Sequence, residues 1–228
     1  MTPLAFDGSR ARIRRARSFI VELEELHQRY AADEPLTAAI SFPPGMDMQV
    51  ALTWKGTGPD PGLVVGDCLH SLRTSLDLMA SELARINGNS DKNVYFPFAA
   101  SAEDFSRTMT ARHFDRCGAD AMALLGQYAP YSGGNDRLRA LHDLDIRDKH
   151  VTLILSHAEM HWKIEEREVF RLQGMVQHVP VRVDAVNFIF PMDTPLAGLP
   201  VIVTLNELAH LVGDIVEAFA KMVADRPT

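Results

Sequence analysis

The stretch LHSLRTSLD, from Leu69 to Asp77, spaces three side chains capable of acid–base chemistry at intervals typical of one helix face. His70, Arg73 and Asp77 lie three and four residues apart, and residues at these intervals are neighbours on an α-helix. A carboxylate near a histidine holds its tautomer and raises its basicity, and an arginine beside them binds phosphate or carboxylate. The set could form an acid–base and anion-binding site. The alternative is that these residues are only the solvent-facing side of an amphipathic helix, opposite its leucine stripe, and the spacing alone favours this alternative.

A second charged segment, RDKH, occupies residues 147–150. On a helix this region carries apolar residues on more than one side, so its charges are enclosed and need partners. We expect Asp148 to pair with Arg73, and Asp77 to pair with the lysine or the histidine of RDKH. The predicted two-helix charged cluster consists of His70, Arg73, Asp77, Asp148, Lys149 and His150. It is either a catalytic set or a polar network that locks two helices together.

An alternative catalytic pair lies in RLRALH, where four residues separate Arg137 from His142. This spacing matches the loose arginine–histidine pattern of HEPN ribonucleases, in which the histidine would act as acid or base and the arginine would steady a phosphate. In that superfamily a polar residue usually follows the arginine, whereas Leu138 stands here. So loose a spacing also occurs by chance.

HAEMH places His157 and His161 four residues apart, which suits a metal ion if the segment is helical. The glutamate stands two positions after the first histidine, whereas the zincin pattern needs it directly after. We therefore predict no metal and no other cofactor. A ligand- or metal-binding module based on clustered histidines is only a third hypothesis.

Apolar spacing and helix and turn signals indicate the elements that must position these residues. Asp60 and Pro61 form a helix start, since aspartate caps helices and proline suits their first turn. Ser101 and Asp104 match a capping-box pattern that opens another helical region. The other expected helices span about 8–32, 61–87, 117–127, a region from near 136, and 205–224. Strand-like alternation predicts a hairpin at about 37–42 and 47–54, and further strands after about residue 160.

These elements predict an α+β fold, because helices and strands fall in separate runs. The expected architecture is a helical core of about four to five helices with an N-terminal β-hairpin and a small antiparallel sheet contributed by the C-terminal half. The 228 residues suit a single α+β domain, 1–228, that can bury a sizeable core.

Composition limits the classes of function. The formal net charge is −7, which does not favour bulk attraction of nucleic acid, so RNA is expected as a partner only through a local basic patch. No apolar run reaches the ~18 residues of a membrane span, and the N-terminus lacks a signal-peptide core. Cys68 and Cys117 match no zinc or redox spacing, and Cys68 is expected to be a buried thiol. We expect no membrane partner and a cytoplasmic location.

The N-terminal stretch SRARIRRARS holds the local basic patch, with five arginines between Arg10 and Arg17. As the start of a helix, it predicts a solvated face whose charge is balanced by the later ELEEL segment. Contact with phosphate or RNA is the alternative.

Four segments follow one another in a specific order: GDCLHSLRTSLDLMASEL, VYFPF, LGQYAPYSGG and LRALHDLDIRDKHVTLIL. As a set they resemble a family of uncharacterised bacterial and phage-associated proteins with an LHNLRSALDH-like helix, a short FPI segment, a QPY loop and an NxDKHR element. The resemblance covers roughly residues 36–157. It implies a site at the six residues of the charged cluster, but no chemistry, because that family has no established activity. Leu78 and Val151 stand where the family often has histidine and arginine, which removes two polar groups.

Two classes of function stay open at this point. The first is a cytosolic bacterial structural or binding domain, in which the charged cluster is a network, with a homo-oligomer as an expected assembly. The second is a HEPN-like ribonuclease or phage-defence effector that acts through Arg137 and His142, or through the set from Arg73 to His150. Whether the protein is an enzyme depends on whether the cluster opens to solvent.

Overall fold

The computed structural model describes residues 5–32, 36–41, 49–54, 61–150, 158–162 and 183–226. The α-helices in these ranges are α1 (Asp7–Ala32), α2 (Pro61–Ile86), α3 (Ala102–Ala111), α4 (Ala119–Tyr128), α5 (Asp136–His150) and α7 (Val201–Ala224). A 3-10 turn, η1 (Phe114–Cys117), precedes α4. The strands are β1 (Leu36–Ser41), β2 (Gln49–Trp54), β3 (Ala158–Trp162) and β4 (Val183–Phe188).

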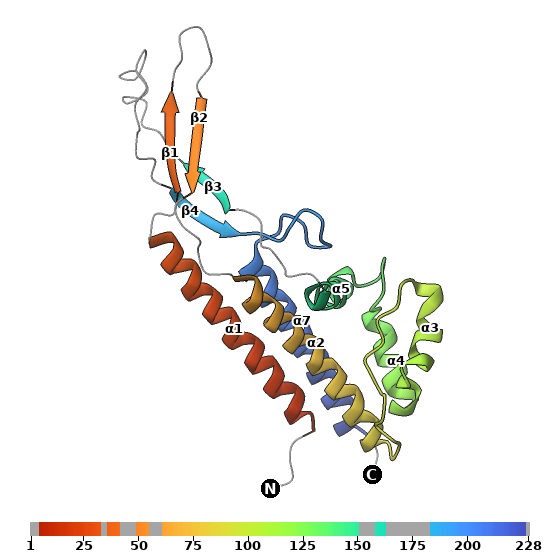
Figure 1. Ribbon diagram of the computed structural model, residues 1–228. Helices are drawn as coiled ribbons and strands as arrows, with labels where there is room; N and C mark the ends of the chain where they lie inside the picture. The colour runs from red at the N-terminus through yellow and green to blue at the C-terminus, as the bar shows by residue number, and fades with distance from the viewer. Residues whose placement is uncertain are drawn as a thin grey trace.

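Three long helices, α1, α2 and α7, run side by side and form the main body of the molecule (Figure 1). Each buries an apolar stripe at helical spacing; in α2 it includes Val65, Leu69, Leu72, Leu76 and Leu83. The helices expected at 8–32, 61–87 and 205–224 are confirmed, and α7 starts earlier than expected, at Val201. Among the described helices, none combines the length and apolarity that a membrane crossing requires.

Local capping chemistry decides where the helices begin and end. Pro61 begins α2, as expected, and Gly88 closes it with φ of 76° while its N–H donates to the carbonyl oxygen of Arg85 at 2.9 Å. Ser101 caps α3, because its Oγ accepts the backbone N–H of Asp104 at 3.3 Å. The predicted cap at this serine is confirmed.

The segment that follows α2, residues 94–99, is irregular and yet mostly buried, with Tyr95 exposed. Phe96 and Phe98 are 0% and 6% exposed, and their ring centroids lie 4.9 Å apart. The backbone N–H of Ala99 donates to the carbonyl oxygen of Pro130 at 3.0 Å, which ties the segment to the loop before α5. Phe96 and Phe98 therefore belong to the core, and the Phe98 ring provides a surface against which the His142 ring stacks.

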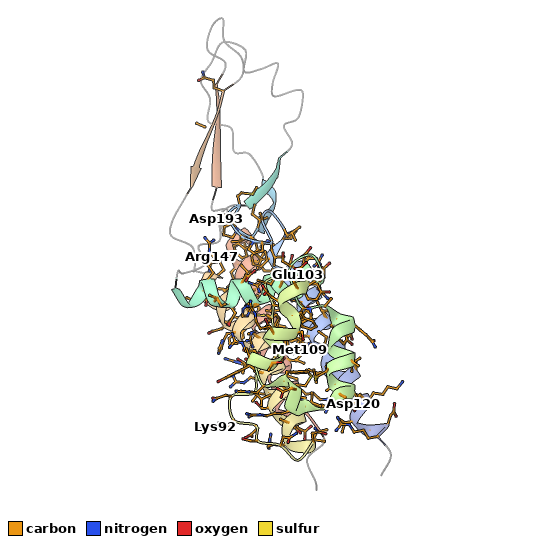
Figure 2. The ribbon with its side chains drawn as sticks, turned by 90° about the vertical axis from the view of Figure 1, so that its right-hand side faces the viewer. Lys92, Glu103, Met109, Asp120, Arg147 and Asp193 are labelled. Carbon is orange, nitrogen blue, oxygen red and sulfur yellow. The ribbon has the colours of Figure 1, made fainter. Side chains whose placement is uncertain are left out.

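α5 lies against the first half of α2 at a close backbone approach. Gly66 of α2 is buried, and a Cβ atom placed on it would overlap the carboxylate of Asp148. The end of α5 is also tied to the loop that precedes α7. Arg147 donates to the backbone oxygen of Asp193 at 2.9 Å and to its carboxylate at 2.6 Å, at the junction visible in Figure 2.

The α+β prediction is wrong, because the fold is mostly helical. β1 pairs with β2 and β3 pairs with β4, both antiparallel, but these are two separate two-stranded ladders at one end of the helices (Figure 1). Every described core residue belongs to a helix or a loop, and Phe188 of β4 packs only against the margin of the core. Alternating residues predict an extended backbone locally, whereas the fold class depends on which elements bury the core.

Gly66→Ala is expected to lower the free energy of unfolding by about 1–2 kcal/mol, although alanine favours a helix by about 1 kcal/mol, because the added methyl group displaces the Asp148 carboxylate. Asp148→Ala removes that obstacle, so it should cost less in the Gly66→Ala background than in the wild type. Urea unfolding of the four proteins measures this coupling.

Gly126→Ala is the matched control, since Gly126 lies within α4 and a Cβ atom there meets open space. It should raise stability by up to about 1 kcal/mol. If Gly66→Ala also stabilises the protein, the close approach of α5 to α2 is wrong.

Candidate functional site

A half-buried polar cluster lies where α2 faces α5, and we call it the α2–α5 cluster. It comprises His70, Arg73 and Asp77 of α2 together with His142 and Asp145 of α5. The buried segment 94–99 closes one side of it through Phe96 and Phe98. The polar face of α2 thus meets a second helix, as the sequence suggested, although the residues that it meets differ.

The half-exposed imidazole of His70 lies against the buried carboxylate of Asp145. His70 Nδ1 lies 2.9 Å from Asp145 Oδ1, and the two side chains are 52% and 4% exposed. On the other side of the ring, Nε2 lies 3.4 Å from Thr74 Oγ1. A carboxylate on Nδ1 holds the proton on that nitrogen and leaves Nε2 as the acceptor. Asp145 therefore fixes the orientation and tautomer of His70.

Arg73 and Asp77 form an ion pair within one turn of α2 that is largely withdrawn from water. Their side chains are 11% and 24% exposed, and the other oxygen of Asp77, Oδ1, accepts the backbone N–H of Phe96 at 2.9 Å. Burial raises the pKa of the Asp77 carboxyl, and the contacts with Arg73 and Phe96 offset only part of that effect. Their spacing of four residues allows this pair on one helix face, and it forms in place of the partners that we expected in RDKH.

His142 lies between an aromatic ring and two arginines. Its ring stacks on Phe98 with centroids 4.7 Å apart and planes at 9°, and Arg73 Nε donates to its Nδ1 at 3.4 Å. The Arg73 guanidinium also lies 4.7 Å above the Phe98 ring centroid. Burial, followed by the positive charges of Arg73 and Arg139, lowers the pKa of His142 to about 4. The imidazole is therefore neutral at pH 7 and accepts a hydrogen bond.

The chemistry that this arrangement can support is limited by its internal contacts. Asp145, His70 and Thr74 follow one another in the order carboxylate, imidazole, hydroxyl, which is the order of groups in hydrolase triads. Such a reaction also needs a donor that stabilises developing negative charge. Arg73, the nearest cation in the cluster, is already bound to Asp77 and His142.

Asp148 lies away from the residue that we expected it to bind. The expected pairing with Arg73 is replaced, since the Asp148 carboxylate rests against Gly66, seven residues or about two helical turns earlier on α2. The crossing point of the two helices decides this outcome, because it sets which turn of α5 stands opposite each turn of α2.

The other predicted partners of Asp77 were Lys149 and His150, whose side chains lie outside the described residues. Asp77 instead pairs with Arg73 of its own helix. The residues of α5 that enter the cluster are His142 and Asp145, which precede RDKH by up to about two turns. The pairing of two helices was therefore anticipated, but its register along α5 was not.

The alternative pair, Arg137 and His142, does not converge. Five positions on an α-helix correspond to a rotation of about 140°, so the two side chains leave α5 on different sides. Arg137 pairs with Glu207 of α7, and both side chains are about half exposed, at 47% and 48%. His142 faces Arg73 and Phe98. In the described structure the two side chains therefore have separate sets of partners.

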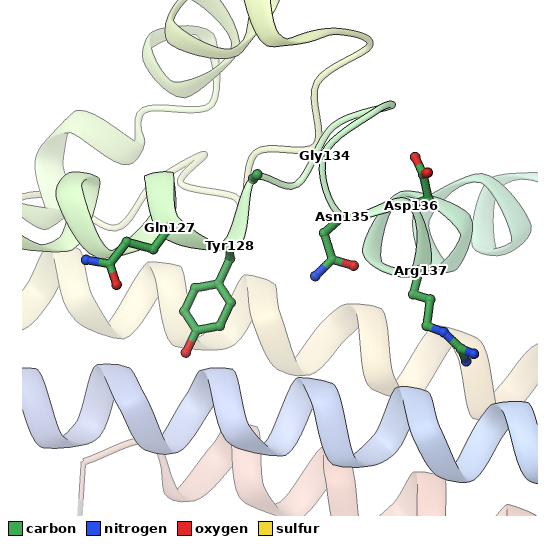
Figure 3. Close-up of a pocket in the computed structure, with 7 residues that line it drawn as sticks. Gln127, Tyr128, Gly134, Asn135, Asp136 and Arg137 are labelled. Atoms are coloured by element: carbon green, nitrogen blue, oxygen red, sulfur yellow. The ribbon is translucent and has the colours of Figure 1, made fainter.

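A hollow of about 410 Å³ lies beside the start of α5 (Figure 3). It is lined by Gln127, Tyr128, Ala129, Gly134, Asn135, Asp136 and Arg137. Asn135 Oδ1 accepts the N–H of Leu138 at 3.1 Å, and Asp136 Oδ1 accepts the N–H of Gly133 at 2.9 Å. These polar groups cap α5 and shape the loop before it, and none of them belongs to the α2–α5 cluster.

The histidines of HAEMH provide no described metal centre. His157 lies outside the described residues, and His161 belongs to β3, where a four-residue spacing does not follow a helix face. Within the ranges that the structure describes, no three histidine, cysteine, aspartate or glutamate side chains gather as metal ligands.

Sequence reasoning missed the roles of Asp145, Phe98 and Gly66. Asp145 carried a usable signal, because it is an acidic residue on the enclosed side of a helix and a buried charge needs a partner. Gly66 also carried one, as a glycine in the middle of a strong helix often marks a close approach. Phe98 carried no usable signal in the sequence, because its contact with His142 depends on the path of an irregular segment.

Comparisons of the chain with models of known families, with curated proteins and with solved structures gave no match in any of the three. The resemblance based on the four ordered segments therefore stays a prediction. The interpretation of the α2–α5 cluster rests on its geometry.

The lowered pKa of His142 predicts a pH dependence of stability. Its pKa rises from about 4 in the folded state toward about 6.5 on unfolding, so its contribution is complete above pH 6.5 and is lost as the pH falls toward 4. His142→Phe keeps a ring against Phe98 but binds no proton. After allowance for solvent screening, the wild type should lose about 1–2 kcal/mol more than this variant between pH 7 and pH 4. Urea unfolding at several pH values measures the difference, and parallel curves would contradict the buried, neutral imidazole.

Proposed function

We propose that this protein is a structural or binding domain in which the α2–α5 cluster locks the helices together and carries out no catalysis. The observation that carries the proposal is the state of Arg73, which is 11% exposed and is engaged by Asp77, by His142 and by the face of Phe98. A cation with these internal contacts stabilises the fold, whereas a catalytic arginine needs N–H groups that are free to bind a substrate.

The contacts of Asp77 support the same function. One of its oxygens binds Arg73 and the other binds the backbone N–H of Phe96, so the carboxylate joins α2 to the segment 94–99. A general base has to have an oxygen within reach of a substrate proton. Both oxygens of Asp77 are used for internal contacts.

The state of His142 argues against a nuclease at this position. An imidazole with a pKa near 4 gives up its proton readily but is a weak base at neutral pH, where efficient proton transfer calls for a pKa close to the working pH. Its ring is stacked on Phe98 and its Nδ1 is bonded to Arg73. These contacts support a packing role for this histidine.

We place the proposed domain in the cytoplasm. Cys68 and Cys117 are free and buried, and burial raises the pKa of each thiol to about 12, so neither is reactive while the protein is folded. Unpaired thiols are typical of reducing compartments. Cell fractionation tests the location, and recovery of the protein in an extracytoplasmic fraction would contradict it.

Breaking the Arg73–Asp77 pair should destabilise the protein strongly. Arg73→Met leaves Asp77 as an uncompensated, half-buried charge, and we expect a loss of about 2–4 kcal/mol in the free energy of unfolding. Adding Asp77→Asn should recover part of that loss, because the remaining charge is removed. Urea unfolding of both single variants and the double variant measures the coupling.

Arg107→Met is the matched control, because Arg107 and Asp104 form an arginine–aspartate pair on α3 whose side chains are 81% and 37% exposed. This control should change stability by less than about 0.5 kcal/mol. An equal effect of the two substitutions would contradict the locking role of Arg73.

The absence of catalysis is tested separately with RNA as substrate. Wild type, His70→Gln, His142→Ala and His150→Ala should all show the same background degradation, because no member of the set acts on the phosphate backbone. RNA cleavage by the wild type that disappears in one folded variant would overturn the proposal in favour of a ribonuclease.

A further inference from the structure

The charges of α1 are separated into a basic first half and an acidic second half. Five arginines lie between Arg10 and Arg17 without an acidic residue among them, and three glutamates follow between Glu22 and Glu25. The two groups are placed too far apart for pairing within the helix. The position four residues after Arg14 is Ser18, and the position four residues after Arg17 is Val21.

Most of these charges are also left without partners from neighbouring helices. Arg10 is the exception, since its guanidinium binds both carboxylate oxygens of Glu217 on α7 at 2.7 and 2.8 Å. Within the described part of the chain, no ion pair or hydrogen bond engages the side chains of Arg12, Arg14 or Arg17. Unlike the charges of the α2–α5 cluster, these three arginines are not neutralised by any residue that the structure describes.

The charged residues at the outside of α1 form one face. At 100° per residue, six exposed positions between residues 11 and 25 fall within an arc of about 100°, with Ser18 near its centre. These positions are Ala11, Arg14, Arg15, Ser18, Glu22 and Glu25, all of them exposed. We call them the outer face of α1, because they lie opposite the buried residues of that helix. The helix itself lies at the edge of the group formed by α1, α2 and α7 in Figure 1. The small side chains at the middle and the end of the outer face allow another helix to approach closely.

This outer face is complementary to itself under a two-fold rotation about Ser18. When a second, antiparallel copy crosses there, Arg14 of one copy stands level with Glu22 of the other, whereas Ala11 stands level with Glu25 and Arg15 with Val21. Arg14 of each copy then faces Glu22 of the other, so this pairing occurs twice, and the basic half of each face lies opposite the acidic half of its partner. A single helix face carries both signs of charge in the order that such a dimer needs.

A second copy fits this face better than a nucleic acid does. A polyanion would be attracted by the arginines but repelled by Glu22 and Glu25 on the same face, and by a chain with a net charge of −7. A second copy satisfies both halves at once. Surface ion pairs are individually weak and are screened by salt, so the complex that they form is weak and salt-sensitive.

We infer that the outer face of α1 is an interaction surface at which two copies of this protein pair antiparallel through Arg14 of one and Glu22 of the other, with Arg15 and Glu25 adding charge to the basic and acidic halves. The surface lies outside the α2–α5 cluster, so the inference goes beyond the proposed function and does not depend on it.

Charge reversal in sedimentation-velocity experiments tests this dimer. The wild type should dimerise with rising concentration at about 50 mM salt and become monomeric at about 500 mM salt. Arg14→Glu with Arg15→Glu makes all four charges of the defined face negative, and Glu22→Arg with Glu25→Arg makes all four positive. Either pair should weaken self-association at least tenfold, whereas an equimolar mixture of the two proteins should form a heterodimer. The protein with all four reversals should dimerise like the wild type.

Arg107→Glu serves as the control, because it reverses an exposed arginine on α3 and should leave self-association unchanged. Circular dichroism confirms that each variant is folded, and restoration by all four reversals excludes a simple folding defect. The inference would be overturned by a wild type that stays monomeric at low salt, or by a dimer whose stability is unchanged by every charge reversal. RNA binding that is lost with Arg14→Glu and Arg15→Glu while the wild type stays monomeric would assign the face to a polyanion instead.

Discussion

A positive charge that is almost removed from water must be stabilised by contacts inside the protein, and this constraint applies to Arg73. Its guanidinium is 11% exposed and contacts the Asp77 carboxylate, the His142 imidazole and the face of the Phe98 ring. Loss of any one partner leaves a half-buried charge poorly solvated, which is expensive. Because the partners belong to α2, to α5 and to the segment 94–99, one cation constrains three parts of the chain.

Other features of the structure follow from this constraint. His142 is neutral because burial disfavours the charged imidazole, and because a protonated ring would also place a second positive charge beside Arg73. Asp77 uses its remaining oxygen to fix the Phe96 N–H, which keeps a buried loop amide from being left without a partner. Gly66 allows α5 to approach α2 closely near the Asp148 carboxylate. The contacts of the α2–α5 cluster and the close crossing of α2 and α5 therefore depend on each other.

The sequence was informative where local periodicity decides the outcome and uninformative where long-range geometry does. The stripe of α2 predicts its length and its polar face, and the spacing of Arg73 and Asp77 places them on that face, because these features depend on spacing within one helix. That Asp145, and not the expected Asp148, is the aspartate of α5 in the cluster depends on where two helices cross, which no local pattern contains. The α+β prediction failed for a related reason, since alternation in short segments does not reveal that the core is built from helices and loops.

The account of function depends on the claim that Asp77, held by Arg73, locks the segment 94–99 to the helices. Hydrogen exchange at the amide of Phe96 tests this claim most directly, because that N–H donates to Asp77 Oδ1 at 2.9 Å. If the cluster is a lock, this amide exchanges only through opening with a free energy close to that of global unfolding, and Asp77→Ala reduces its protection far more than that of the α7 amides. Rapid exchange of Phe96 in the wild type, at the rate of an exposed loop, would contradict the account.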